Sequence, residues 1–223
     1  MNSLRIAGAA SALLMASIYL LGFAIFFSVL DPGRTLTRDE SIQFLSENRL
    51  IVLPTIFVLY VLAGFNLLIL VQSLAGEVKD RVPWLSQTAL IIGSIWCVMV
   101  IVAGFVYLSG MQAVFSLYPE NAAQASTLAL MIDTLFESLG GGNELIGGVW
   151  TVLISCLLLN ATQNYRILHF FGIAVGIAGV VSIVPMLAEA VTIFGLGQIF
   201  WFIGLGVRFL RNKRRDHNPR AHD

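Results

Sequence analysis

The sequence predicts an all-α integral membrane protein: a bundle of six transmembrane helices with an amphipathic helix at the outer interface. Three observations support this fold class, namely a low charge content, six long apolar runs and an uneven distribution of cations between those runs. The chain has 223 residues, of which 57% are hydrophobic and 12% charged, and its mean hydropathy is +0.85. A soluble domain carries about 25% charged residues. Charged residues are too few to cover a surface that faces water, so much of the protein's surface must face lipid.

Six apolar runs are long enough to be considered as membrane spans, because a helix needs about 20 apolar residues to cross a hydrocarbon core of roughly 30 Å. The first run exceeds the roughly 7–15 apolar residues of a secretory signal, so we expect an uncleaved span. The fourth is the shortest, and only a few residues around Glu189 separate the fifth from the sixth, which predicts a tight helical hairpin. The predicted spans are residues 6–30, 50–74, 84–109, 144–160, 167–187 and 191–210.

Positive charge alternates between the segments that join these spans. One set of segments, including a basic tail over residues 211–223, holds Arg5, Lys79, Arg81, Arg166, Arg208, Arg211, Lys213, Arg214, Arg215 and Arg220. The opposite set holds only Arg34, Arg38 and Arg49. Because cytoplasmic segments of membrane proteins are enriched in Lys and Arg, both termini are predicted to be cytoplasmic.

Two outer segments have helical patterns. Thr37 and Glu40 have the spacing of a capping box, which predicts a short helix leading into the second span. Residues 121–139 form an amphipathic pattern ended by glycines. Its apolar stripe consists of Leu128, Met131, Ile132, Leu135, Phe136 and Leu139. Two placements fit this helix: flat in the outer interface, which is the simpler interpretation, or packed over the bundle as a lid.

Acidic residues gather on the predicted outer side. Asp133 and Glu137 are i, i+4 neighbours on one helix face. Glu144 begins the fourth span, and Glu189 lies in the turn between the fifth and sixth spans. Converging carboxylates of this kind can bind a divalent cation. The alternative, which we prefer, is a set of solvated acids on a polar helix face. Glu144 stands out because acids that enter the membrane are functional candidates.

Glycines and a few polar or aromatic residues mark the most distinctive part of the chain. Five glycines fall between Gly140 and Gly148, which suits either a broken helix that faces an anion or a turn before a tightly packed span. Gly172 and Gly176 have the spacing of a helix-packing motif. A ligand is expected to contact residues at the start of span four and within spans four and six: Asn143, Glu144, Trp150, Gln198 and Trp201.

Enzymatic motifs are missing from the sequence, which has no HExxH, no paired intramembrane aspartates and no histidine cluster. His169 is expected at the membrane interface, and no charged residue is expected deep in the bundle. We therefore predict a non-enzymatic protein, without cofactor or metal, that binds an apolar small molecule, a lipid or a partner membrane protein. The alternatives are a small transporter or channel for a cation or weakly polar solute, and a metal-dependent lipid-headgroup enzyme using Asp133, Glu137 and Glu144.

Two Gly- and Trp-rich stretches carry a family resemblance. In residues 142–150, and again in residues 194–202 followed by Gly204 to Arg208, the sequence resembles a bacterial family of six-span membrane proteins known only as a domain of unknown function. The resemblance covers nearly the whole chain and implies six helices in a bacterial inner membrane. It implies no activity or catalytic residue. The expected partners are membrane lipid and either a partner membrane protein or a second copy of the chain, and nucleic acid is not expected.

Overall fold

A computed structural model describes residues 2–30, 33, 35–141, 144–161 and 164–216, and in these ranges the protein is mostly helical and contains no strand. Within these ranges, five helical segments are long and apolar enough to cross a membrane, as expected of a multi-pass membrane protein. They are Ser3–Val29, Arg49–Val78, Pro83–Leu117, Ala122–Ala161 and Ala190–Arg211. A sixth apolar helix, Arg166–Val181, is shorter. The all-helical membrane class is therefore supported, whereas the count of six spans stays a prediction.

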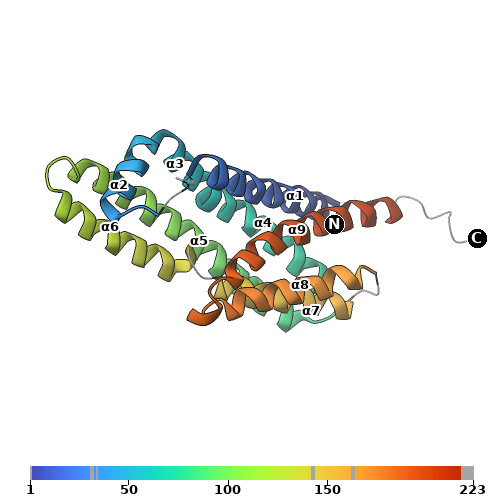
Figure 1. The fold of residues 1–223 in the computed structure, drawn as a ribbon. Coiled ribbons are helices and arrows are strands. Elements are labelled where there is room, and N and C mark those ends of the chain that lie inside the picture. Colours follow the sequence, from blue (N-terminus) through green and yellow to red (C-terminus); the bar gives the residue numbers. More distant parts are fainter. Residues whose placement is uncertain (1, 31–32, 34, 142–143, 162–163, 217–223) are drawn as a thin grey trace, which may run out of the picture.

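The first half of the chain forms three long rods (Figure 1). Helix α1 (Asn2–Ile25) ends in a π-helical turn, η1 (Phe26–Leu30). The second rod is continuous from α3 (Arg49–Ile56) through the π-helix η2 (Phe57–Leu62) into α4 (Ala63–Val78). The third is α5 (Pro83–Leu117), whose proline occupies the first helical turn, where its missing N–H costs no hydrogen bond. Helix α5 extends eight residues beyond the predicted end of span three at residue 109.

The second half of the chain is divided into more helical elements, most of them shorter than the rods of the first half. It contains α6 (Ala122–Phe136), η3 (Glu137–Gly141), α7 (Leu145–Ala161), α8 (Arg166–Val181), η4 (Pro185–Leu187) and α9 (Ala190–Asp216). Helix α8 ends six residues before the predicted end of span five. Val184 is extended, with φ −79° and ψ 120°, because a residue before proline is sterically pushed out of the helical region.

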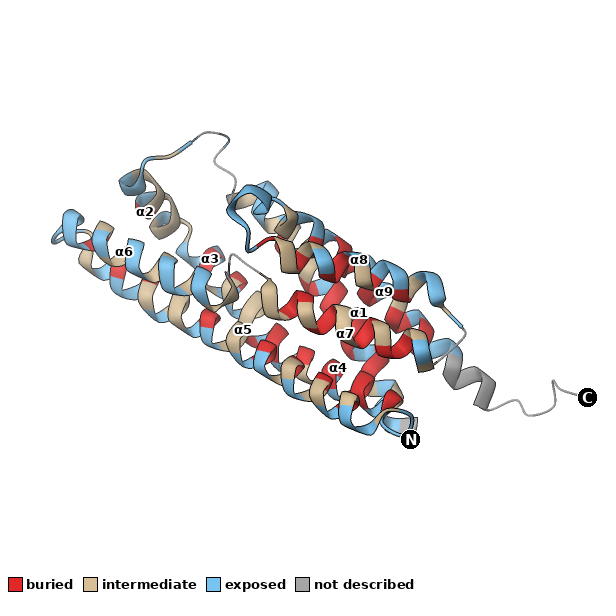
Figure 2. Cartoon of the chain, turned by 90° about the horizontal axis from the view of Figure 1, so that it is seen from below, coloured by how far each residue is buried: buried red, intermediate tan, exposed pale blue. Residues whose placement is uncertain are grey.

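Helices α1, α4, α7, α8, α9 and the first half of α5 pack into one bundle, which holds most of the buried residues (Figure 2). Glycines let α7 and α8 approach closely: a Cβ added at Gly148 would lie 2.6 Å from the carbonyl oxygen of Gly176. The predicted packing role of these glycines is thereby confirmed. The first residue of α1 and the last turns of α9 lie at the same end of the bundle, which we call the terminal end (Figure 1).

The opposite end of the molecule is a smaller unit, which we call the distal lobe: α2 (Arg38–Glu47), α6 and the second half of α5. Helix α6 runs back antiparallel along α5 (Figure 1). The lobe has its own small core, consisting of Ile42, Met111, Val114, Phe115, Ala125 and Ala129. The predicted capping box at the start of α2 is confirmed, with the Thr37 amide donating to Glu40 at 2.8 Å and the Glu40 amide donating to Thr37 Oγ1 at 3.3 Å.

Candidate ligand site in the bundle

Three tryptophans from different helices form a contiguous group inside the bundle. Trp96 of α5 lies 5.6 Å from Trp150 of α7, and Trp150 lies 6.0 Å from Trp201 of α9, measured between ring centroids. All three are buried. Glycines make room for the rings: a Cβ added at Gly147 would lie 2.5 Å from Trp96, and one at Gly93 would lie 2.5 Å from Trp150.

A polar pair lies beside these rings. Gln198 of α9 donates a hydrogen bond from Nε2 to Oγ1 of Thr151 at 2.9 Å, and Thr151 in turn donates to the carbonyl oxygen of Gly147 at 2.8 Å. Both side chains are fully buried. We call Trp96, Trp150, Thr151, Gln198 and Trp201 the tryptophan site.

Polar atoms without a hydrogen-bond partner are concentrated in this part of the bundle. Within the described residues, they are Nε1 of Trp96, Trp150 and Trp201, Oε1 of Gln198, Oγ of Ser155, both ring nitrogens of His169 and Nε of Arg208. More than about 90% of buried polar groups in proteins are paired, and each unpaired one costs about 1–3 kcal/mol. All seven residues belong to α5, α7, α8 or α9 and lie inside the bundle.

Glu144 lies just before α7, at the distal side of the tryptophan site. It is half-buried. Its carboxylate interacts with the Trp96 side chain, although no partner within hydrogen-bonding geometry of the Trp96 N–H is found among the described residues. Tyr19 of α1 and Tyr60 of η2 also lie within electrostatic range of this carboxylate. Glu144 is therefore directed toward aromatic side chains of three elements rather than toward other acids.

A second polar group, which we call the terminal cluster, consists of Glu77, His169 and Arg208. Nη1 of Arg208 donates to Oε2 of Glu77 at 2.6 Å, and the two side chains are 5% and 12% exposed. His169 is fully buried and interacts electrostatically with Arg208. His169, expected at the membrane interface, is enclosed by neighbouring helices, and its depth in the membrane stays a prediction. The expectation that no charged residue lies deep in the bundle also stays a prediction, because Glu77 is the second-last residue of α4. Packing of α8 between α7 and α9 is what buries the imidazole.

The five predicted ligand-binding residues are partly brought together. Trp150, Gln198 and Trp201 are neighbours in the tryptophan site, and Glu144 is close to it through Trp96. Asn143 lies outside the described residues. Sequence reasoning missed the partnership of Glu77, His169 and Arg208. A signal was available: Glu77 follows a long apolar stretch of α4, and Arg208 lies before the basic end of α9 at the end of another. Ionisable residues in apolar membrane helices usually have a functional or pairing role.

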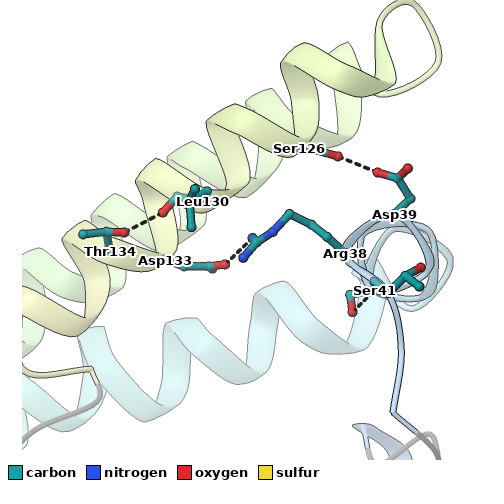
Figure 3. A network of polar contacts seen from close by, with 8 residues as sticks. Arg38, Asp39, Ser41, Ser126, Leu130, Asp133 and Thr134 are labelled. Atoms are coloured by element: carbon teal, nitrogen blue, oxygen red, sulfur yellow. Dashed lines mark hydrogen bonds and ion pairs between the residues drawn. The ribbon is translucent and has the colours of Figure 1, made fainter. Parts of the chain in front are cut away.

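The acids of the distal lobe serve as contacts between helices (Figure 3). Nη1 of Arg38 in α2 lies 3.0 Å from Oδ2 of Asp133 in α6, and Ser126 Oγ donates to Asp39 Oδ1 at 2.5 Å. A pocket of about 250 Å³ lies beside the first of these contacts, between α2, α5 and α6. In the described part of the chain, no three His, Cys, Asp or Glu side chains are placed to hold a metal ion.

Comparison with known proteins gives no relative: no family model, no curated protein and no solved structure matches this chain. Its function is therefore inferred from its own residues and their geometry.

Proposed function

We propose that this chain is a non-enzymatic integral membrane protein that binds an apolar small molecule or a lipid at the tryptophan site. The observation that supports this function is the set of three neighbouring indole N–H groups, on Trp96, Trp150 and Trp201, without partners among the described residues. An indole N–H is a donor only. Molecules that suit the site are therefore largely apolar and carry oxygen atoms that accept hydrogen bonds, because aromatic walls with a few placed polar groups are typical of ligand sites.

The setting proposed for this function is a bacterial inner membrane that the chain crosses six times, with α8 as the shortest span. Both termini are cytoplasmic in this arrangement, and the distal lobe is on the outer side. Supporting it are the cations of the terminal end, among which Arg5, Lys79, Arg81, Arg166 and Arg211 lie near helix ends. A partner membrane protein or a second copy of the chain would bind at the lipid-facing surface of the bundle.

Native mass spectrometry of the purified protein tests the binding function directly. The matched variants are Trp150→Phe and Trp201→Phe, which keep an aromatic ring but remove the indole N–H, with Trp84→Phe as the control because Trp84 is 69% exposed. The wild-type protein and Trp84→Phe are expected to retain the same molecule, and the two core variants to lose it. If the wild-type protein retains no lipid or small molecule, or if all variants retain it equally, the proposal fails.

A second function, transport of a cation or weakly polar solute, is favoured by one observation: the buried ion pair between Glu77 and Arg208. Charged residues inside membrane bundles commonly mark ion or substrate pathways. Solute flux in proteoliposomes tests this second function. Glu144→Gln is expected to slow the flux, and Asp133→Asn tests whether the acids of the outer side take part in it. Unchanged flux in both variants would exclude an acid-lined entry, and an absence of flux in the wild-type protein would exclude transport.

A further inference from the structure

We propose that the terminal end of the bundle contains a binding site for an oxyanion, specifically a phosphate group, formed by Arg208 and His169. This site goes beyond the tryptophan site, and it does not depend on that site having a ligand. The phosphate group belongs either to the headgroup of an anionic lipid or to free inorganic phosphate. The chemistry of the buried side chains of the terminal cluster and the register of α8 against α9 support this site.

Arg208 is the cation of this site. Glu77 accepts one hydrogen bond from its Nη1 at 2.6 Å, so the guanidinium is held in a defined orientation inside the bundle. Its Nε–H has no partner among the described residues. An arginine side chain is always charged and its fork of N–H donors matches the oxygen atoms of phosphate and carboxylate. The unused Nε–H is therefore a donor that an oxyanion can accept from.

His169 lies close to Arg208 because of the antiparallel register of α8 and α9. A Cβ added at Gly204 would contact Leu168, and one added at Gly172 would contact Trp201. This register places His169 about one turn from Arg208, in agreement with their electrostatic interaction. Both ring nitrogens are buried and without a partner in the described part of the chain. A neutral imidazole supplies one N–H donor.

Ser155 lies beside Trp201 rather than at the terminal cluster. Its Oγ and the Trp201 Nε1 both lie where a side chain at Gly172 would be, so the two groups are neighbours on one face of α8. The hydroxyl of Ser155 is fully buried and has no partner among the described atoms. At the terminal cluster, the Nε–H of Arg208 and one imidazole N–H of His169 are left as donors, which favours a ligand that accepts hydrogen bonds.

Charge distinguishes an oxyanion from a proton or metal cation as the ligand. A proton on His169 would place a second positive charge beside Arg208 in a medium of low dielectric constant, where like charges repel strongly. Glu77, the acid of the cluster, is already paired with Arg208. At the helix ends around the cluster, Arg5, Lys79, Arg81, Arg166 and Arg211 are cations, and Asp80 and Asp216 are acids. The local potential is therefore positive and attracts anions.

The test uses the full-length protein in nanodiscs of zwitterionic phosphatidylcholine, titrated with inorganic phosphate by calorimetry. A parallel arm adds phosphatidylglycerol and counts retained lipid by native mass spectrometry. His169→Phe, which keeps an aromatic ring, is expected to weaken binding about tenfold, the loss of one charge-assisted hydrogen bond, and His169→Gln to restore part of it. Arg211→Gln is the matched control, because Arg211 is an exposed cation at the same end, and is expected to change binding less than about twofold.

Each outcome decides the proposal. Phosphate binding that His169→Phe weakens identifies a site for a free oxyanion. Retention of phosphatidylglycerol alone, again lost in His169→Phe, identifies a headgroup site. If neither probe binds, or if His169→Phe and Arg211→Gln have equal effects, there is no oxyanion site. Trp150→Phe is expected to leave phosphate binding unchanged, so the oxyanion site and the tryptophan site can fail separately.

Discussion

Nη1 of Arg208 lies 2.6 Å from Oε2 of Glu77, and this contact joins the last helix of the chain to α4 inside the bundle. The two residues are 131 positions apart. Transfer of both charges out of water is unfavourable, so removing one partner leaves the other charge buried without compensation.

Breaking this pair is expected to destabilise the bundle. Glu77→Gln or Arg208→Ala should lower the free energy of unfolding by about 3–5 kcal/mol, the usual cost of leaving one member of a buried pair unpaired. The measurement is reversible unfolding in mixed detergent micelles. Asp133→Asn breaks the pair with Arg38, whose side chains are both 43% exposed, and should cost less than about 1 kcal/mol because solvent screens it. If Glu77→Gln and Asp133→Asn lower the free energy of unfolding equally, the burial of the Glu77–Arg208 pair is contradicted.

The close approach of α7 and α8 gives a second prediction. Gly148→Ala places a methyl group 2.6 Å from the Gly176 carbonyl oxygen and 2.6 Å from the Val180 amide nitrogen. Backbone atoms cannot rotate away, so the helices must separate, at a cost of about 1–3 kcal/mol for overpacking. Gly195→Ala is the control, since its methyl group would meet only Phe23, at 3.4 Å. Thermal unfolding of both variants checks the prediction, which fails if Gly148→Ala is as stable as Gly195→Ala.

The contact between α1 and α4 is held by a reciprocal pair of polar bonds. Asn66 Nδ2 donates to the carbonyl oxygen of Ser11 at 2.9 Å, and Ser11 Oγ donates to the carbonyl oxygen of Asn66 at 2.7 Å. Hydrogen bonds between membrane helices contribute about 0.6 kcal/mol on average. Asn66→Leu should therefore be only mildly destabilising, by less than about 2 kcal/mol, in unfolding titrations. A loss comparable to that of Arg208→Ala would show that Asn66 has a further role.

Membrane orientation can be measured with single cysteines. In a background without Cys97 and Cys156, Ser126→Cys in the distal lobe should react with an impermeant maleimide added outside intact cells, because α6, which carries Ser126, lies at the opposite end of the molecule from the start of α1 and the last turns of α9 (Figures 1 and 3). Asn2→Cys should react only after the cells are opened. The reverse pattern would invert the proposed topology.

Local features of this protein followed from its sequence. The apolar runs placed most helices to within a few residues, and the Thr37–Glu40 spacing correctly predicted the start of α2. These features depend on interactions between residues a few positions apart, such as a cap or a periodic stripe. The end of α8 was misplaced because the effect of Pro185 on Val184 was overlooked, although that signal is also local.

Which groups meet inside the bundle was decided by tertiary structure alone. Spans such as α5 and α7 are apolar on nearly every face, so their sequences contain no stripe that indicates which side faces a neighbour. Helix rotation and register, set by the close contacts at Gly147, Gly148 and Gly172, bring Trp96, Trp150 and Trp201 together and bury His169. Glu77 and Arg208 meet for the same reason, since nothing local in the chain links two residues so far apart.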